Sequence, residues 1–207
     1  RYPRVAPDGR IVVRTSTEAG FRIRRMEADG SNPEFVVDGL QWGRPAITPD
    51  GEWLVYEALI EGVPKIWRVP LDGGEPELVI DRFSSLPVVS PDGKRIAFYY
   101  RDSDEDDFMF GVATFPEGEL LSSRDSEAAY GGSMLRWTPD GEALLMNTVP
   151  SDRANLWRLP LGGGELEKIT DFADRRLYWF ELAPDGETLV VARGELSRDA
   201  VLIKDFQ

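Results

Sequence analysis

The tripeptide Pro-Asp-Gly occurs five times along this chain. Its aspartates are Asp8, Asp50, Asp92, Asp140 and Asp185, at intervals of 42, 42, 48 and 45 residues. Proline presets an early turn position, aspartate accepts hydrogen bonds from nearby backbone, and glycine tolerates a positive φ, so each copy predicts a tight turn. A turn that recurs at an almost constant interval indicates a chain built from structural repeats.

Short runs of β-branched and aromatic residues flank these turns, as in segments 86–90 and 95–99. A third run ends in a glycine-rich turn in two repeats, where Trp67 and Trp157 each follow the turn aspartate by 17 residues. A fourth run comes next, for example at 78–80. Each repeat therefore consists of predicted strands A, B, C and D, with the Pro-Asp-Gly turn between A and B, and no amphipathic helix is evident.

Four-stranded units at a period near 42 residues are typical of β-propeller blades, which bury both faces against neighbouring blades around an axis. We therefore predict an all-β fold, a single β-propeller domain over 1–207 made of five four-stranded repeats. The predicted blades are 1–41, 42–81, 82–125, 126–171 and 172–207.

The fifth repeat ends with the strand C expected at 201–206, so that its outer strand is missing. Three arrangements would accommodate the unpaired edge. The chain is part of a larger ring of roughly six to eight blades, or it closes as five blades with a three-stranded last blade, or its open edges pair with another copy. The first residues, Arg1-Tyr2-Pro3, favour a processed chain or a fragment.

The net charge and two missing residue types exclude several kinds of partner and catalytic site. The chain has 24 Lys and Arg against 37 Asp and Glu, a net charge of −13, and contains neither histidine nor cysteine. The acidity argues against nucleic acid or an anionic membrane as the main partner. Without histidine and cysteine there is no Ser-His-Asp triad, thiol nucleophile or disulfide. No apolar run approaches the roughly 18 residues of a membrane span.

The repeat resembles that of the TolB-like β-propellers, whose WD-like units carry a Ser/Thr-Pro-Asp-Gly turn. The segments 48–51, 90–93 and 137–141 match best, together with the Trp-Arg and Gly-Gly segments of strand C and its turn. The ending at 198–206 resembles propellers appended to bacterial receptor-type Ser/Thr kinases and winged-helix regulators. The resemblance implies a sensory or interaction domain of a larger bacterial protein, in a periplasmic or other extracytoplasmic location.

Strand order assigns the loops to two faces. The A–B and C–D turns lie on one face, whereas the B–C and D–A loops, which differ in length between repeats, lie on the other. Variable loops on a rigid scaffold commonly carry binding residues. We therefore predict a partner-binding surface there, with Arg82 and Phe83 in one D–A loop and Arg175, Arg176 and Tyr178 in another.

An acidic stretch in the third B–C loop offers a candidate metal site. Asp102, Asp104 and Asp106 alternate along the chain and carry the hard oxygen ligands that Ca²⁺ prefers. The alternative is a solvated acidic hairpin tip, because acidic runs repel one another and stay hydrated. No other cofactor is expected.

These observations favour a non-catalytic binding or sensing scaffold that presents its variable-loop face to a protein, peptide or small ligand. The alternative is a carboxylate-based glycan-active enzyme, for which a facing pair of Asp or Glu side chains would suffice, or an accessory propeller of an enzyme. We expect a protein or peptide partner, no nucleic acid, no direct membrane insertion by this segment, and self-association where blade edges are open.

Overall fold

The computed structural model describes residues 3–18, 20–37, 41–103, 105–125, 134–147, 155–183 and 186–195. These residues form antiparallel strands and turns, and no helix occurs among them. The strands pair into five sheets in sequence order. They are β1 (Arg4–Val5), β2 (Ile11–Thr17), β3 (Gly20–Met26) and β4 (Glu34–Val37) in the first sheet; β5 (Gln41–Ile47), β6 (Trp53–Ile60), β7 (Val63–Pro70) and β8 (Glu77–Ile80) in the second; β9 (Ser84–Val89), β10 (Arg95–Tyr100), β11 (Met109–Thr114) and β12 (Leu120–Asp125) in the third; β13 (Leu135–Trp137), β14 (Ala143–Met146), β15 (Trp157–Pro160) and β16 (Glu167–Lys168) in the fourth; and β17 (Arg176–Leu182) and β18 (Leu189–Gly194) in the fifth.

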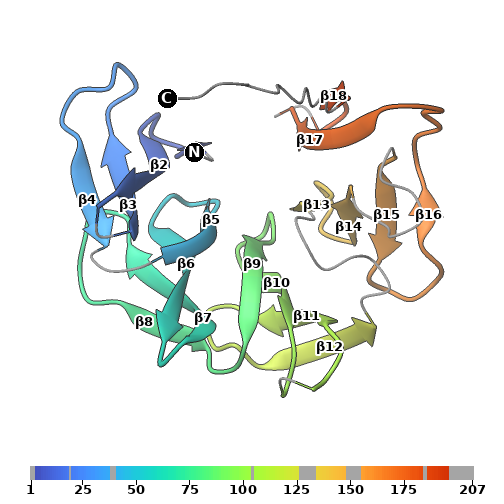
Figure 1. The fold of residues 1–207 in the computed structure, drawn as a ribbon, viewed down its shortest axis with the longest axis horizontal. Helices are drawn as coiled ribbons and strands as arrows, with labels where there is room; N and C mark the ends of the chain where they lie inside the picture. The colour runs from blue at the N-terminus through green and yellow to red at the C-terminus, as the bar shows by residue number, and fades with distance from the viewer. Residues whose placement is uncertain are drawn as a thin grey trace, which may run out of the picture.

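The sheets follow one another along an arc around a common axis, with β5, β9 and β13 nearest the axis and β4, β8, β12 and β16 at the rim (Figure 1). This arrangement confirms the predicted all-β propeller of five repeats. The third strand expected in the fifth repeat, at 201–206, lies outside the described residues. In the part of the chain that the structure describes, no helix has the length and apolar character needed to cross a membrane.

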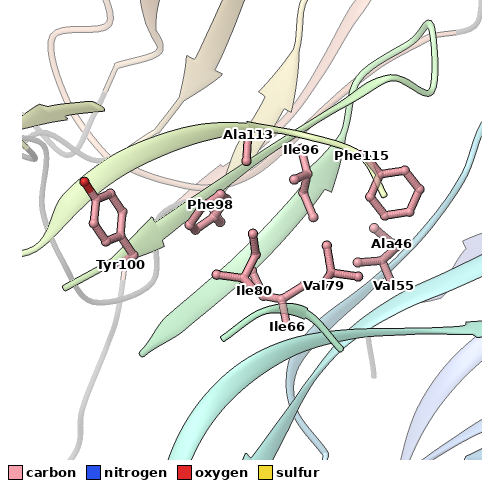
Figure 2. Close-up of a cluster of buried hydrophobic side chains, with 10 residues drawn as sticks. All are labelled: Ala46, Val55, Ile66, Val79, Ile80, Ile96, Phe98, Tyr100, Ala113 and Phe115. Atoms are coloured by element: carbon pink, nitrogen blue, oxygen red, sulfur yellow. The ribbon is translucent and has the colours of Figure 1, made fainter. Parts of the chain in front are cut away.

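Each hydrophobic core lies between two neighbouring sheets, because the strands inside a blade are buried on both faces. β10 shows the alternation: Ile96 and Phe98 pack toward the second sheet, whereas Ala97 and Tyr99 pack toward the fourth. Figure 2 shows the core between the second and third sheets. Full burial of one large apolar side chain stabilises a fold by about 1.5–3 kcal/mol, so the contacts between blades hold the arc together.

The Pro-Asp-Gly turns close by hydrogen bonds within their own repeat. Asp50 Oδ1 accepts the N–H of Glu52 at 3.0 Å. The Thr48 hydroxyl donates to Asp50 at 2.5 Å and accepts a backbone N–H five residues later at 3.0 Å. Ser90 and Thr138 make the same pair of bonds in the third and fourth repeats. The Ser/Thr-Pro-Asp-Gly turn is therefore a local structural unit, as its residues predicted.

Candidate functional site

On the predicted loop face, Arg82 and Phe83 lie in the D–A loop before β9, and their side chains contact the B–C loop between β10 and β11. Arg82 Nη1 lies 2.8 Å from Asp102 Oδ1, and its guanidinium lies 5.4 Å from the ring centroid of Tyr100. Phe83 meets Phe108 edge to face, with ring centroids 5.4 Å apart. The structure thus brings the D–A and B–C loops of this sheet together, as strand order predicted. The Arg82 side chain remains 43% exposed.

The calcium prediction concerns the same B–C loop. Asp102 is ion-paired with Arg82, and the N–H of Asp106 donates to the Ser103 carbonyl at 3.3 Å. Asp104 lies outside the described residues. Among the residues that are described, no group of three or more acidic side chains is placed to hold a metal ion. The calcium site therefore stays a prediction, with Arg82 as a competing partner for Asp102.

The other predicted surface lies at the start of β17, where Arg176 and Tyr178 belong to the strand itself and not to the loop. Arg175 immediately precedes the strand with a φ of +61°, and its Nε lies 3.8 Å from a carboxylate oxygen of Glu195. The Arg176 guanidinium lies 5.6 Å from the Tyr178 ring, and Tyr178 is 43% exposed. An exposed arginine beside an exposed tyrosine ring, with a second exposed arginine before it in the chain, is typical of a protein-binding hot spot.

Side chains from two other segments hold the loop in front of this surface. Asn155 is buried; its side chain accepts the N–H of Phe172 at 2.7 Å and donates to the Phe172 carbonyl at 3.2 Å. Arg193 lies 3.8 Å over the Phe172 ring and donates to the carbonyl of Asp174. The surface is therefore presented from a fixed backbone, which the sequence patterns did not reveal.

A cavity of about 570 Å³ is lined by the inner strands of all five sheets. Nearly all of its wall comes from the residues four and three positions before each turn aspartate. These are Arg4, Ala46, Val88, Arg136 and Glu181 at the fourth position and Val5, Ile47, Val89, Trp137 and Leu182 at the third, joined by Pro3. The cavity therefore lies at the ends of the inner strands beside the Pro-Asp-Gly turns, away from the predicted loop face.

Among the described residues, two guanidinium groups and one carboxylate line this cavity. Arg136 Nε and Nη2 donate to the two carboxylate oxygens of Glu181 at 2.6 and 2.7 Å. Arg4 Nη1 lies 3.8 Å from the same carboxylate, and Arg4 Nε donates to the Pro45 carbonyl at 3.2 Å. Arg44 lines a small adjoining space together with Arg4 and Arg136. Among the described residues that line the larger cavity, positive charge thus exceeds negative charge, in a chain of net charge −13.

Burial and neighbouring charge both disfavour the charged form of Arg4. Burial lowers the pKa of Arg4 to about 10, and the positive charges of Arg136 and Arg44 act in the same direction while Glu181 opposes them. Both burial and neighbouring like charge disfavour a charged group. An additional anion near Arg4 would therefore be favourable.

A buried carboxyl group stands beside these arginines. Glu57 on β6 is 4% exposed and accepts the N–H of Leu86, on the inner strand of the next sheet, at 2.6 Å. Burial raises the pKa of Glu57 to about 7, although this hydrogen bond and the charges of Arg14 and Arg44 oppose the rise. Leu86 has a φ of +55°, which costs energy in a residue other than glycine. Glu57 therefore holds a strained part of the axial wall.

Sequence reasoning missed these axial charges, although the aligned repeats contain their signal. Arg4, Arg136 and Glu181 all stand four residues before a turn aspartate, and Ala46 and Val88 fill that position in the other two repeats. Because equivalent positions of a propeller converge on its axis, charged residues at a position otherwise occupied by small apolar ones mark an axial site.

Comparison with known proteins finds distant relatives, and no protein-family profile matches the chain. The chain is 26% identical over 169 residues to dipeptidyl-peptidase 5 of Aspergillus fumigatus, covering 70% of this chain and 23% of that protein. It is 28% identical over 195 residues to an uncharacterised protein of Agrobacterium fabrum, covering 91% of this chain and 64% of that protein. The chain thus spans about a quarter of the fungal peptidase and just under two thirds of the bacterial relative.

Solved structures share the architecture at low sequence identity. TolB from Acinetobacter baumannii matches with a TM-score of 0.71 and 21% identity, over 87% of this chain and 45% of that chain. A protein described as TolB from Agrobacterium tumefaciens matches with a TM-score of 0.73 and 23% identity, over 94% of this chain and 69% of that chain. With its five repeated sheets and Ser/Thr-Pro-Asp-Gly turns, the chain has the fold of the TolB-like β-propellers.

Proposed function

We propose that this propeller is a non-catalytic interaction module that binds a protein or peptide partner on the face of its B–C and D–A loops. The observation that carries the proposal is the exposed group of Arg175, Arg176 and Tyr178, which follows a loop that Asn155 binds at Phe172. A fixed surface loses little entropy on binding. Arg82 adds a further exposed cation on the same face.

The chemistry of this surface defines the kind of partner. Exposed arginines beside a tyrosine ring suit a polypeptide that carries carboxylates, because guanidinium groups bind carboxylates bidentately. We place the propeller in a larger bacterial protein, as a sensory or interaction domain in a periplasmic or other extracytoplasmic location. The TolB-like fold and the partial coverage of the relatives support this placement.

A second candidate function, an accessory propeller of a peptidase, is favoured by the 26% identity with dipeptidyl-peptidase 5. A hydrolase domain encoded in the same open reading frame would distinguish it from the first. The glycan-active alternative needs two facing carboxylates. In the described wall of the axial cavity Glu181 is the one carboxylate, and Arg136 binds it.

Site-specific photo-cross-linking in the full-length protein, expressed in its native cells, tests the loop face. A photoreactive amino acid replaces Tyr178 in one variant and Glu52, which is exposed on the turn face, in the matched control. We expect a polypeptide adduct from the Tyr178 position and none from the Glu52 position. Changing Arg175 and Arg176 to alanine should remove the adduct, because the cations supply the attraction.

Three results would contradict the proposal. Adducts in equal yield from both positions, or from Glu52 alone, would refute the choice of face. Turnover by the purified protein in a broad hydrolase and lyase screen would refute the non-catalytic assignment.

A further inference from the structure

We propose that the axial cavity is a second binding site, specific for a small organic carboxylate with an apolar body, in which Arg4 and Arg136 bind the carboxylate. The site lies beside the Pro-Asp-Gly turns and is separate from the loop face assigned to a polypeptide partner. Its occupant and its test are therefore independent of the proposed interaction function.

The excess of guanidinium groups is the first support. The described lining of the axial cavity contains two guanidinium groups, those of Arg4 and Arg136, against the single carboxylate of Glu181. The side chains of Arg4 and Arg136 are only 20% and 13% exposed, so water screens their charges incompletely. Buried positive charge without an equal number of anions is costly. A bound anion offsets that cost.

The geometry around Glu181 shows that a carboxylate fits the site. Arg136 already binds the Glu181 carboxylate through two parallel hydrogen bonds of 2.6 and 2.7 Å, so a planar carboxylate matches the guanidinium fork. Arg4 Nη1 lies 3.8 Å from that carboxylate, beyond hydrogen-bonding distance. Glu181 thus satisfies Arg136 more fully than Arg4. We infer that Glu181 acts as an internal competitor for the ligand carboxylate.

The apolar residues of the remaining cavity wall favour a ligand with an apolar body. Residues three positions before the turn aspartates are all apolar, and they include Val5, Trp137 and Leu182. Val5 is 69% exposed, which leaves apolar surface that a ligand can cover. A cavity of about 570 Å³ accommodates a small molecule. Arginines and apolar side chains together therefore suit an alkyl or aryl carboxylate better than a bare inorganic ion.

Calorimetric titration of the purified chain with hexanoate tests the site, with hexanamide and inorganic phosphate as comparison probes. We expect hexanoate to bind, the neutral amide to bind at least tenfold more weakly, and phosphate to bind more weakly than hexanoate. Arg4→Gln should weaken hexanoate binding at least tenfold. Glu181→Gln should strengthen it severalfold, because the internal competitor is lost and Arg136 is released.

The matched control is Arg158→Gln, which removes an arginine from a strand ion pair with Glu167 away from the cavity lining and should leave hexanoate affinity unchanged. Circular dichroism and thermal melting establish that each variant is folded. The proposal is overturned if neither the wild type nor folded Glu181→Gln binds hexanoate, or if amide and carboxylate bind equally. Phosphate binding without hexanoate binding would also overturn it. Cross-linking at Tyr178 is unaffected by these outcomes, so failure of one proposal does not imply failure of the other.

Discussion

The Pro-Asp-Gly turns and the axial wall lie within a few residues of each other in every repeat, yet they differ in kind. The turn keeps the same three residues in all five repeats, whereas the position four residues earlier is Arg, Ala, Val, Arg and Glu. The turn bonds close within one repeat, as between Asp50 and Glu52. The axial contacts join different sheets, as between Arg136 and Glu181.

The difference teaches where to look for specificity in a repeated fold. A residue type that recurs at one position of every repeat is needed for the backbone conformation that all the repeats share. A charged residue at an axial position that is apolar in other repeats is not needed for the local backbone, and its partners come from other blades. The axial charges are therefore better candidates for binding than the more conspicuous repeated aspartates.

The largest expected effect is a loss of folding stability with rising pH, which arises at Glu57 beside the axial wall. The Glu57 carboxyl has its pKa raised from 4.5 to about 7 by burial, so the folded state should lose stability as pH rises through this range. The loss amounts to about 3 kcal/mol by linkage. Glu57→Gln keeps an acceptor for Leu86 and should remove most of the loss. Urea midpoints at pH 5 and pH 8 measure it.

The turn aspartates should act in the opposite direction. Hydrogen bonds from the Thr48 hydroxyl and from the N–H of Glu52 lower the pKa of Asp50. Its contribution to folding stability is therefore present above the unfolded pKa and is lost as pH falls.

Glu75→Gln, at an exposed position, is the matched control for Glu57→Gln and should leave the pH dependence unchanged. A Glu57→Gln protein as sensitive to alkaline pH as the wild type would contradict the role assigned to Glu57.

A smaller effect should appear where one turn packs on the next. Gly51 and Gly9 both have positive φ, +78° and +90°. A Cβ on Gly51 would lie 3.0 Å from Pro7 Cδ, whereas a Cβ on Gly9 would meet nothing within 4 Å. Alanine should therefore cost about 2–3 kcal/mol at Gly51 and about 1 kcal/mol at Gly9. Equal changes in urea midpoint would show that contact between turns does not contribute.

The smallest effect concerns the hydroxyl of the turn. Ser90 is fully buried, and its Oγ accepts the N–H of Arg95 at 2.9 Å. Ser90→Ala should cost about 1 kcal/mol, the usual value for one hydrogen bond. Thermal melting against Ser122→Ala, at an exposed position, measures it. A much larger loss would mean that the turn depends on its hydroxyl, although Ala6 and Ala183 occupy that position in two repeats.

Sequence predicted the fold in detail, because its signals are local. Strands A and B around each turn follow from β-rich runs and a tight turn, and the structure confirms them in all five repeats. Of the residues predicted on loops, Arg82, Phe83 and Arg175 precede strands, whereas Arg176 and Tyr178 lie within strand β17, and their binding role stays a prediction. The axial cavity was not predicted, because its residues are far apart in sequence and meet only when five blades share an axis.

The amino-acid sequence by itself determined the repeat, its turn and the alternation that buries both faces of each blade, since all three depend on residues close together in the chain. Only the tertiary structure decided that Arg136 pairs with Glu181 and that Arg4 approaches the same carboxylate. The physical reason is that a propeller arranges the equivalent positions of its repeats side by side around one axis. Charges more than a hundred residues apart, such as Arg4 and Glu181, become neighbours there, in the lining of one cavity.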